Sequence, residues 1–311
     1  MFFNVSNRFF ISIFFILFLF SNWAVASTIS GKLNAFIKYN QGIGSSDKST
    51  EQISLAIQEQ YQVLFLNEFK PEKLNALSTI DLEHLFSAAF EAAFYTEDQQ
   101  RANDMALIVR YLQKKNKATN QHYEKLYNVY ILVRMMTAAQ DLRQKHPTPQ
   151  MEPLPELLEA ANLIKNMPTE WQVSLSQHKL ERRSVDINSG SHVIVVSHPN
   201  CHFSQNAMRE IMLDPILKQA FVTHVKWLIP QSYDLNFNSV QNWNHTHPEL
   251  PMTIAYFSKE WPSIDYWGTP SFYFFKDGIL HSKVIGWPRE GNKEKLLEAL
   301  RLIGLIESIK E

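Results

Sequence analysis

The chain has 311 residues, which suits two domains of ordinary size, and its composition, 45% hydrophobic and 20% charged, excludes a disordered protein. Its formal net charge of −1 and scattered basic residues argue against a broad nucleic-acid-binding surface. The 11 histidines do not have the spacing of metal ligands, so we expect no metal site.

The first 26 residues have the features of a secretory signal peptide. Arg8 and the amino terminus supply positive charge, Phe9 to Phe20 form an apolar run, and Ala24-Val25-Ala26 is a small-x-small cleavage site. A helix of this run rises about 18 Å, which is less than the hydrocarbon core of about 30 Å. We expect cleavage, no stable membrane span in the mature chain, and secretion, most simply into a bacterial periplasm. An uncleaved membrane anchor is the alternative.

Residues 27–170 are expected to form an all-α domain. The polar stretch from Gln41 to Glu51 indicates a loop, and from Gln52 to about Lys145 apolar residues recur at helical spacing. No glycine occurs between Gly44 and Gly190, as a helical array tolerates. The segments resemble antiparallel helical hairpins, weakly tetratricopeptide-like because no period of about 34 residues aligns. Their apolar stripes indicate core packing, with a groove for a protein partner as the alternative.

A domain boundary is expected near residue 170. A cluster of prolines from Pro147 to Pro155 interrupts the helical pattern, and one further short helix is expected from Glu156 to Asn166. From Trp171 onward the periodicity changes to the alternation typical of strands, at Val173 and Leu175, with Leu180 to Ile187 as a further candidate strand. Residues 171–311 therefore form the second domain.

The only cysteine of the chain, Cys201, follows a short β-branched run. His192 to Val196 has the sequence HVIVV, which is typical of a buried strand, and an amphipathic helix that carries Ala207, Ile211, Met212 and Ile216 follows the motif. Cys201 therefore lies in the turn from a strand into a helix N-terminus. Unpaired N–H groups and the helix dipole favour an anion at such a position, which lowers the pKa of a thiol and raises its reactivity.

The later elements follow in a regular order. Phe221 to Leu228 is expected to be a second parallel strand, and the asparagine-rich stretch after it contains a helix. Two strands flank Asp277-Gly278, a favoured hairpin turn, and the second strand ends at Gly286. Lys293 to Leu302 is expected to be the last helix.

Three features of this region occur in a characteristic order. A strand leads into the C-x-x-S motif of Cys201 to Ser204, Thr269-Pro270 precedes the hairpin, and Phe275 to Gly278 precedes the last helix. In these features residues 190–303 resemble the thioredoxin superfamily. The resemblance implies a thioredoxin-like α/β domain with a cis peptide bond before Pro270, facing Cys201. It also implies that the Thr269 backbone pairs with an extended substrate segment.

The motif departs from the family pattern at its second cysteine, which is Ser204 here. The family's preceding tryptophan is Asn200, and its internal Gly-Pro is His202-Phe203. Without a resolving cysteine only monothiol chemistry remains, in which Cys201 attacks a disulfide and an outside thiol releases the product. Ser204 and His202 are expected to tune Cys201, with His198 in a supporting role. A solvent-facing position is the alternative for His202.

Other single-cysteine members of the superfamily suggest other functions. Thiol-retention proteins of the secretory pathway use C-x-x-S, and the Cys-Gly-Phe-Ser of monothiol glutaredoxins resembles the motif here but would bring glutathione and an iron–sulfur cluster. Peroxiredoxins need Thr or Ser where this chain has His198. For an exported chain we therefore expect no cofactor, and thiol–disulfide exchange with protein thiols and disulfides, isomerase-like or forming mixed disulfides. The rival is a redox-inactive binding protein whose helical domain recruits a partner.

Overall fold

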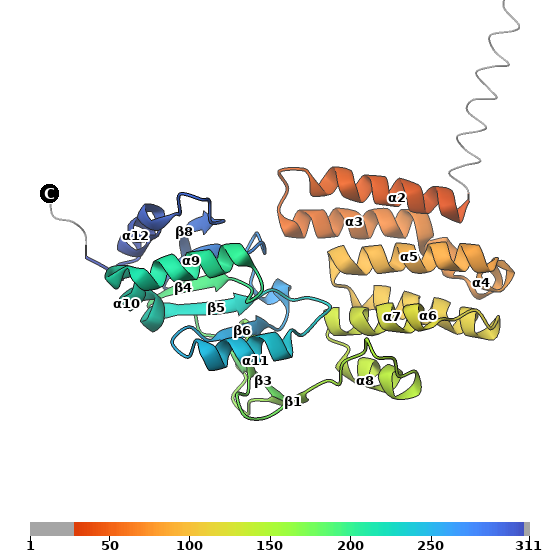
Figure 1. Ribbon diagram of the computed structural model, residues 1–311. Coiled ribbons are helices and arrows are strands. Elements are labelled where there is room, and N and C mark those ends of the chain that lie inside the picture. The colour runs from red at the N-terminus through yellow and green to blue at the C-terminus, as the bar shows by residue number, and fades with distance from the viewer. Residues whose placement is uncertain (1–27, 308–311) are drawn as a thin grey trace, which may run out of the picture. The chain divides into compact units, whose positions relative to one another are not determined.

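The structure is a computed structural model that describes residues 28–307, and the expected signal peptide lies outside these residues (Figure 1). The chain divides into two compact units, Met1–Met151 and Glu152–Glu311, called below the helical unit and the sheet unit. This division comes earlier than the expected boundary near residue 170, because the strand Glu156–Glu159, which lies before that point, belongs to the sheet. Within residues 28–307 no helix is both long and apolar enough to cross a membrane.

The described part of the helical unit, residues 28–151, contains helices and no strand, as the periodicity predicts. The long helices that follow one another in the chain pack on one another, and α5 also contacts α2 and α7 (Figure 1). The elements are α2 (Ile29–Gly44), α3 (Thr50–Phe65), the 3-10 helix η1 (Leu66–Phe69), α4 (Pro71–Ala76), α5 (Thr79–Thr96), α6 (Gln99–Lys114), α7 (Asn120–Leu132) and α8 (Met136–Lys145).

Side-chain caps stabilise the starts of two of these helices. Ser49 and Gln52 form a reciprocal capping box at the start of α3, and the Ser78 hydroxyl accepts from the first turn of α5. The predicted loop from Gln41 to Glu51 is wrong over most of its length, since α2 continues to Gly44 and α3 starts at Thr50. Burial of one face of α2 sustains the helix through its exposed glycines.

The sheet unit contains, within residues 152–307, an eight-stranded mixed sheet of order β1-β3-β2-β6-β5-β4-β7-β8. The neighbours β4, β5 and β6 run parallel, whereas β7 is antiparallel to β4 and to β8. The strands are β1 (Glu156–Glu159), β2 (Thr169–Val173), β3 (Lys179–Ser184), β4 (Ser191–Val196), β5 (Val225–Ile229), β6 (Met252–Ala255), β7 (Ser271–Lys276) and β8 (Ile279–Ile285). The helices are α9 (His202–Leu213), α10 (Pro215–His224), α11 (Phe237–Thr246) and α12 (Lys293–Leu302), with the 3-10 helix η2 (Ser258–Glu260).

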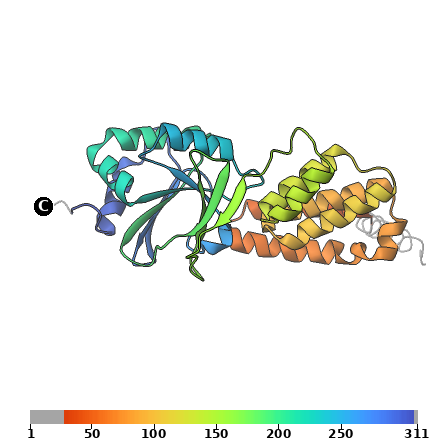
Figure 2. The ribbon, with the colours of Figure 1, turned by 90° about the horizontal axis from the view of Figure 1, so that it is seen from below.

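The two faces of this sheet are covered differently. Alternate side chains of a strand point to opposite faces, so Tyr273 and Phe275 of β7 join a core cluster with Trp261 of the segment after β6. On the opposite face Phe272 contacts Phe221 of α10, and the helices α9, α10 and α11 lie along one side of the sheet (Figure 2). The Asp277-Gly278 hairpin is present as predicted, with φ of 48° and 77°.

One predicted helix in this unit is wrong, and another ends earlier than expected. The expected helix from Glu156 to Asn166 is instead β1 followed by turns, because the β1 backbone pairs with β3 and this pairing overrides local propensity. The amphipathic helix expected to carry Ala207 through Ile216 ends at Leu213, and Ile216 belongs to α10, which Asp214 caps and whose first position is Pro215.

The expected strand from Phe221 to Leu228 also begins later, at Val225. Phe221 belongs to α10, where its apolar ring is buried against the sheet, so an apolar run alone did not separate the helix end from the strand start. The short strand β6 was not predicted. It extends the parallel part of the sheet beside β5.

Candidate functional site

Cys201 lies between the end of β4 and the start of α9. The Ser197 N–H still donates to Leu228 of β5 at 2.9 Å, and the chain then turns through Pro199-Asn200. The Cys201 N–H donates to the carbonyl of His198 at 3.0 Å, which closes the turn, and Cys201 is the N-cap residue of α9. The predicted strand-to-helix position of the cysteine is therefore present.

The sheet brings Thr269-Pro270 to this cysteine across 68 residues of sequence. The Cys201 thiol is half-buried and lies 3.5 Å from the carbonyl oxygen of Thr269, to which the protonated thiol donates. The Thr269-Pro270 peptide bond is cis, as the resemblance implies. Pro270 is buried, and its carbonyl accepts from the N–H of Gly286 at 2.8 Å, which joins this turn to the end of β8.

Opposing effects set the acidity of Cys201. Burial raises the pKa of the thiol, whereas interactions with the Thr269 side chain, with the N–H and hydroxyl of Ser204 and with the N–H of Phe203 lower it, so that the pKa lies below its ordinary value. The contact with the Thr269 carbonyl acts the other way, because only the protonated thiol can donate to it. Among the causes that lower the pKa, the Thr269 side chain is the largest, and the Ser204 and Phe203 groups at the start of α9 add to it.

Ser204, the residue in place of a second cysteine, points inward. Its side chain is fully buried, and its hydroxyl makes no hydrogen bond of standard geometry with any residue in the described range 28–307. It nevertheless lies close enough to the thiol for its dipole to lower the pKa of Cys201. The tuning role of Ser204 therefore stays a prediction.

The two histidines of the motif occupy different environments. His202 is exposed in the first turn of α9, its ring 3.9 Å from that of Phe203, and it makes no hydrogen bond to the thiol among the described residues. This is the solvent-facing alternative for His202. His198 is half-buried, and its Nδ1 accepts from the N–H of Asn200 at 3.1 Å, so it shapes the turn that leads to Cys201.

The backbone of Thr269 has free hydrogen-bonding capacity. Within residues 28–307 no group accepts from its N–H, and the Cys201 thiol is the donor to its carbonyl. An extended peptide laid beside Thr269 would find both groups of a β-ladder within reach of the thiol. The expected substrate-binding role of Thr269-Pro270 is thus geometrically available.

A cavity of about 400 Å³ opens beside Thr269 and was missed by sequence reasoning. Its polar and aromatic walls come from the loop between β5 and α11 and from the segment before the cis bond. The available signal was the irregular stretch after β5, rich in polar residues and tyrosine. The lining residues are His198, Pro230, Ser232, Tyr233, Asp234, Asn236, Trp267, Gly268 and Thr269.

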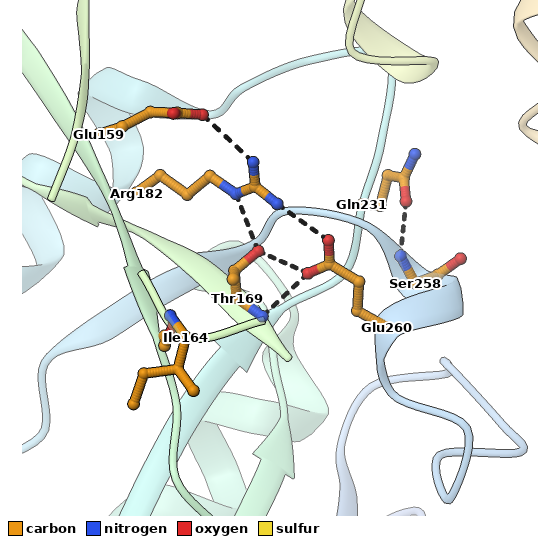
Figure 3. Close-up of polar contacts among 8 residues, drawn as sticks. Glu159, Ile164, Thr169, Arg182, Gln231, Ser258 and Glu260 are labelled. Atoms are coloured by element: carbon orange, nitrogen blue, oxygen red, sulfur yellow. Dashed lines mark hydrogen bonds and ion pairs between the residues drawn. The ribbon is translucent and has the colours of Figure 1, made fainter. Parts of the chain in front are cut away.

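A separate cluster of charged residues joins the sheet to the segment after β6 (Figure 3). Glu260 of η2 accepts from the N–H of Thr169 at 2.9 Å and pairs with Arg182 at 3.0 Å, and the Arg182 guanidinium lies 3.6 Å from the ring centroid of Tyr256. These groups satisfy one another, so we regard them as structural. In the part of the chain that the structure describes, no three His, Cys, Asp or Glu side chains are arranged to hold a metal ion.

No family model and no curated protein matches this sequence. Among solved structures, the crystal structure of a thioredoxin-like protein from Bacteroides caccae is 15% identical, covers 80% of this chain and 84% of its own, and has a TM-score of 0.28. So low a TM-score supports no conclusion about the fold, and the interpretation of the site therefore rests on its own geometry. The chain joins an all-α unit to a mixed α/β unit in which Cys201 meets a cis-proline turn.

Proposed function

We propose that the sheet unit is a thioredoxin-like exchange domain of an exported protein, with Cys201 as the nucleophile toward disulfides. The observation that carries the proposal is the convergence of Cys201, at the N-terminus of α9, with the cis Thr269-Pro270 turn. The lowered pKa of the thiol supports it further, because the thiolate is the attacking species. Export, most simply to a bacterial periplasm, rests on the signal-like residues 1–26.

The proposed reaction needs one protein thiol and an outside thiol. The Cys201 thiolate attacks one sulfur of a substrate disulfide, the sulfur–sulfur bond of the substrate breaks, and the second sulfur leaves with the bonding electrons and takes a proton from water. The product is a mixed disulfide between Cys201 and the substrate. Because the chain contains 1 cysteine, a second thiol, of the substrate or of a small-molecule reductant, must attack this bond to regenerate Cys201.

The residues around Cys201 have separate roles in this proposal. Ser204 and the first N–H groups of α9 stabilise the thiolate, and the Thr269 backbone aligns the substrate segment as an added strand. A substrate strand would take over the Thr269 carbonyl from the thiol, so that binding frees the thiol to ionise. His198 supports the turn. The exposed His202 has no role beyond the helix start.

The alternative is a redox-inactive binding protein whose helical unit recruits a partner. Two observations favour it: the thiol of Cys201 is half-buried with its proton directed to Thr269, and the helical unit exposes apolar side chains, with Val63 at 78% and Leu66 at 66% exposure. In that case Cys201 would be a packed residue and would label only after unfolding.

The discriminating experiment is a pH titration of the alkylation rate of Cys201 in the native, mature chain. The exchange proposal predicts rapid labelling near neutral pH with a midpoint below about 8.5, the ordinary value for a free thiol. A midpoint at or above that value, or labelling only in denaturant, contradicts the proposal and favours the binding protein.

Trapping of products provides the second readout. Wild-type protein should accumulate mixed disulfides on non-reducing gels, and Cys201→Ala should show none. Ser204→Cys should show far fewer, because the new thiol would attack the mixed disulfide within the same molecule, and it should gain dithiol oxidase or insulin-reductase activity. Identical gels for wild type and Cys201→Ala, with an inert Ser204→Cys, would contradict exchange.

A further inference from the structure

We propose that the cavity beside Thr269 selects disulfide substrates that carry an arginine or lysine within two positions of the reacting cysteine. The inference rests on the proposed function and names the class of substrate that it takes. Thr269 lines the cavity and also contacts the thiol, so a peptide paired with its backbone passes the mouth of the cavity. Side chains of an added strand alternate between its two faces. One substrate side chain close to the reacting cysteine would therefore point into the cavity.

The charge of the cavity is negative. Asp234 is the acidic residue among those that line the cavity, and none of them is a lysine or an arginine. One Asp234 oxygen accepts from the N–H of Asn236 at 2.7 Å, and the other has no partner among residues 28–307. Asp234 is exposed, and a cationic side chain in the cavity would find an opposite charge there.

The aromatic walls suit the same occupant. Tyr233 is 49% exposed and Trp267 is half-buried, and in the described residues neither ring stacks on another ring or holds a cation. Aromatic faces attract guanidinium and ammonium groups, most strongly those of tryptophan. The long apolar stem of arginine or lysine would pack on these rings while its head reaches Asp234.

The cavity is already formed without a substrate. The Ser232 hydroxyl donates to the carbonyl of Asp234 at 2.5 Å and accepts from its N–H at 3.3 Å. The buried Gln231 side chain accepts from the N–H of Ser258 at 2.7 Å, which fastens the loop to η2 (Figure 3). Because these hydrogen bonds fix the loop, it loses little conformational entropy when a substrate side chain enters the cavity. The shape of the cavity therefore contributes to selection together with its charge.

The experiment measures one exchange step with three peptides. Each carries a cysteine activated as a pyridyl disulfide and flanked on both sides by arginine, glutamine or glutamate. The Cys201 thiolate of the mature chain attacks the peptide sulfur and releases pyridinethione, whose absorbance gives the rate constant; the pyridine thiol leaves because of its low pKa. We expect the arginine peptide to react about fivefold or more faster than the glutamate peptide, with less preference at high salt.

Two variants locate the preference. In Asp234→Asn the ratio of the arginine rate to the glutamine rate should fall well below its wild-type value, because the two aromatic rings alone then attract the cation. Glu290→Gln makes the same change in net charge at an exposed residue that does not line the cavity, and it should keep the wild-type ratio. Equal rates for the three peptides in wild type, or a ratio that persists in Asp234→Asn, overturn the inference while exchange stands. Release from none of the peptides overturns the proposed function and this inference with it.

Discussion

The two units differ in how far along the chain their decisive contacts reach. In the helical unit the hydrogen bonds that start α3 and α5 join residues three positions apart. In the sheet unit the contact between Cys201 and Thr269 spans 68 positions, and that between Thr169 and Glu260 spans 91. Local bonds can shape a scaffold, but only a sheet register that joins distant strands can place a thiol against a cis-proline turn. The proposed chemistry belongs to the unit built from distant contacts.

The largest expected effect tests whether the two units are independent. Phe36 is fully buried, and its ring packs edge-on against Tyr61 and Phe65 at 5.8 Å. Phe36→Ala should lower the free energy of unfolding of the helical unit by about 3–5 kcal/mol, because it leaves a cavity. Hydrogen exchange measured by mass spectrometry, peptide by peptide, should show faster exchange in α2, α3 and α5, with the alkylation rate of Cys201 unchanged.

The matched control lies in the other unit. Phe274 is fully buried in β7 opposite Val193 of β4, so Phe274→Ala should speed exchange in the sheet unit and raise the alkylation rate of Cys201. Faster alkylation of Cys201 in Phe36→Ala would mean that the units do not fold separately and would break the comparison.

A smaller effect is expected from the charged cluster that joins distant parts of the sheet unit (Figure 3). Glu260→Gln removes the charge that Arg182 and the Thr169 N–H share, and should lower the free energy of unfolding by about 1–3 kcal/mol. Glu159→Gln is the control, because Glu159 pairs with the same arginine but its side chain is 66% exposed. It should cost less than about 1 kcal/mol in urea unfolding. Equal losses would show that exposure does not decide the strength of these pairs.

The smallest effect concerns a charged pair of the helical unit and its dependence on pH. Burial raises the pKa of Glu68, but hydrogen bonds and electrostatic attraction from Lys32 and Lys73 lower it by more. The pKa therefore lies below its ordinary value of 4.5. A carboxyl whose pKa is lower in the folded state stabilises that state fully above its unfolded value, and the gain is lost as the pH falls through the folded value. The protection of α2 against hydrogen exchange, corrected for the intrinsic exchange rate at each pH, should therefore decrease at acid pH.

Substitution of this residue sharpens the prediction. Glu68→Gln should lower the stability of the helical unit by about 1–2 kcal/mol at neutral pH and should remove part of the acid dependence. Asp104 of α6 gives the opposite sign, because burial raises its pKa, so its contribution is lost as the pH rises. If the stability of the helical unit falls equally at acid pH in wild type and in Glu68→Gln, other carboxylates dominate its acid dependence.

The sequence by itself determined the features that follow from local pattern. Helical periodicity predicted the helices between residues 52 and 145, and the HVIVV run placed Cys201 between a strand and a helix, where β4 and α9 lie. The Asp277-Gly278 turn was predictable because both residues adopt positive φ, which asparagine, aspartate and glycine tolerate best. Each of these signals involves residues within about one or two turns of one another, so no knowledge of the fold was needed.

Tertiary structure alone decided the rest. Glu156–Glu159 became a strand because β3 offered it backbone partners, and helices ended at Glu97, Asn116 and Arg134 with positive φ although no glycine marked these ends. The cavity walls at Tyr233, Asp234 and Trp267 come from two segments that meet only when the sheet forms. Burial and strand pairing are set by distant residues, and their free energy exceeds the local preferences that a sequence pattern reports.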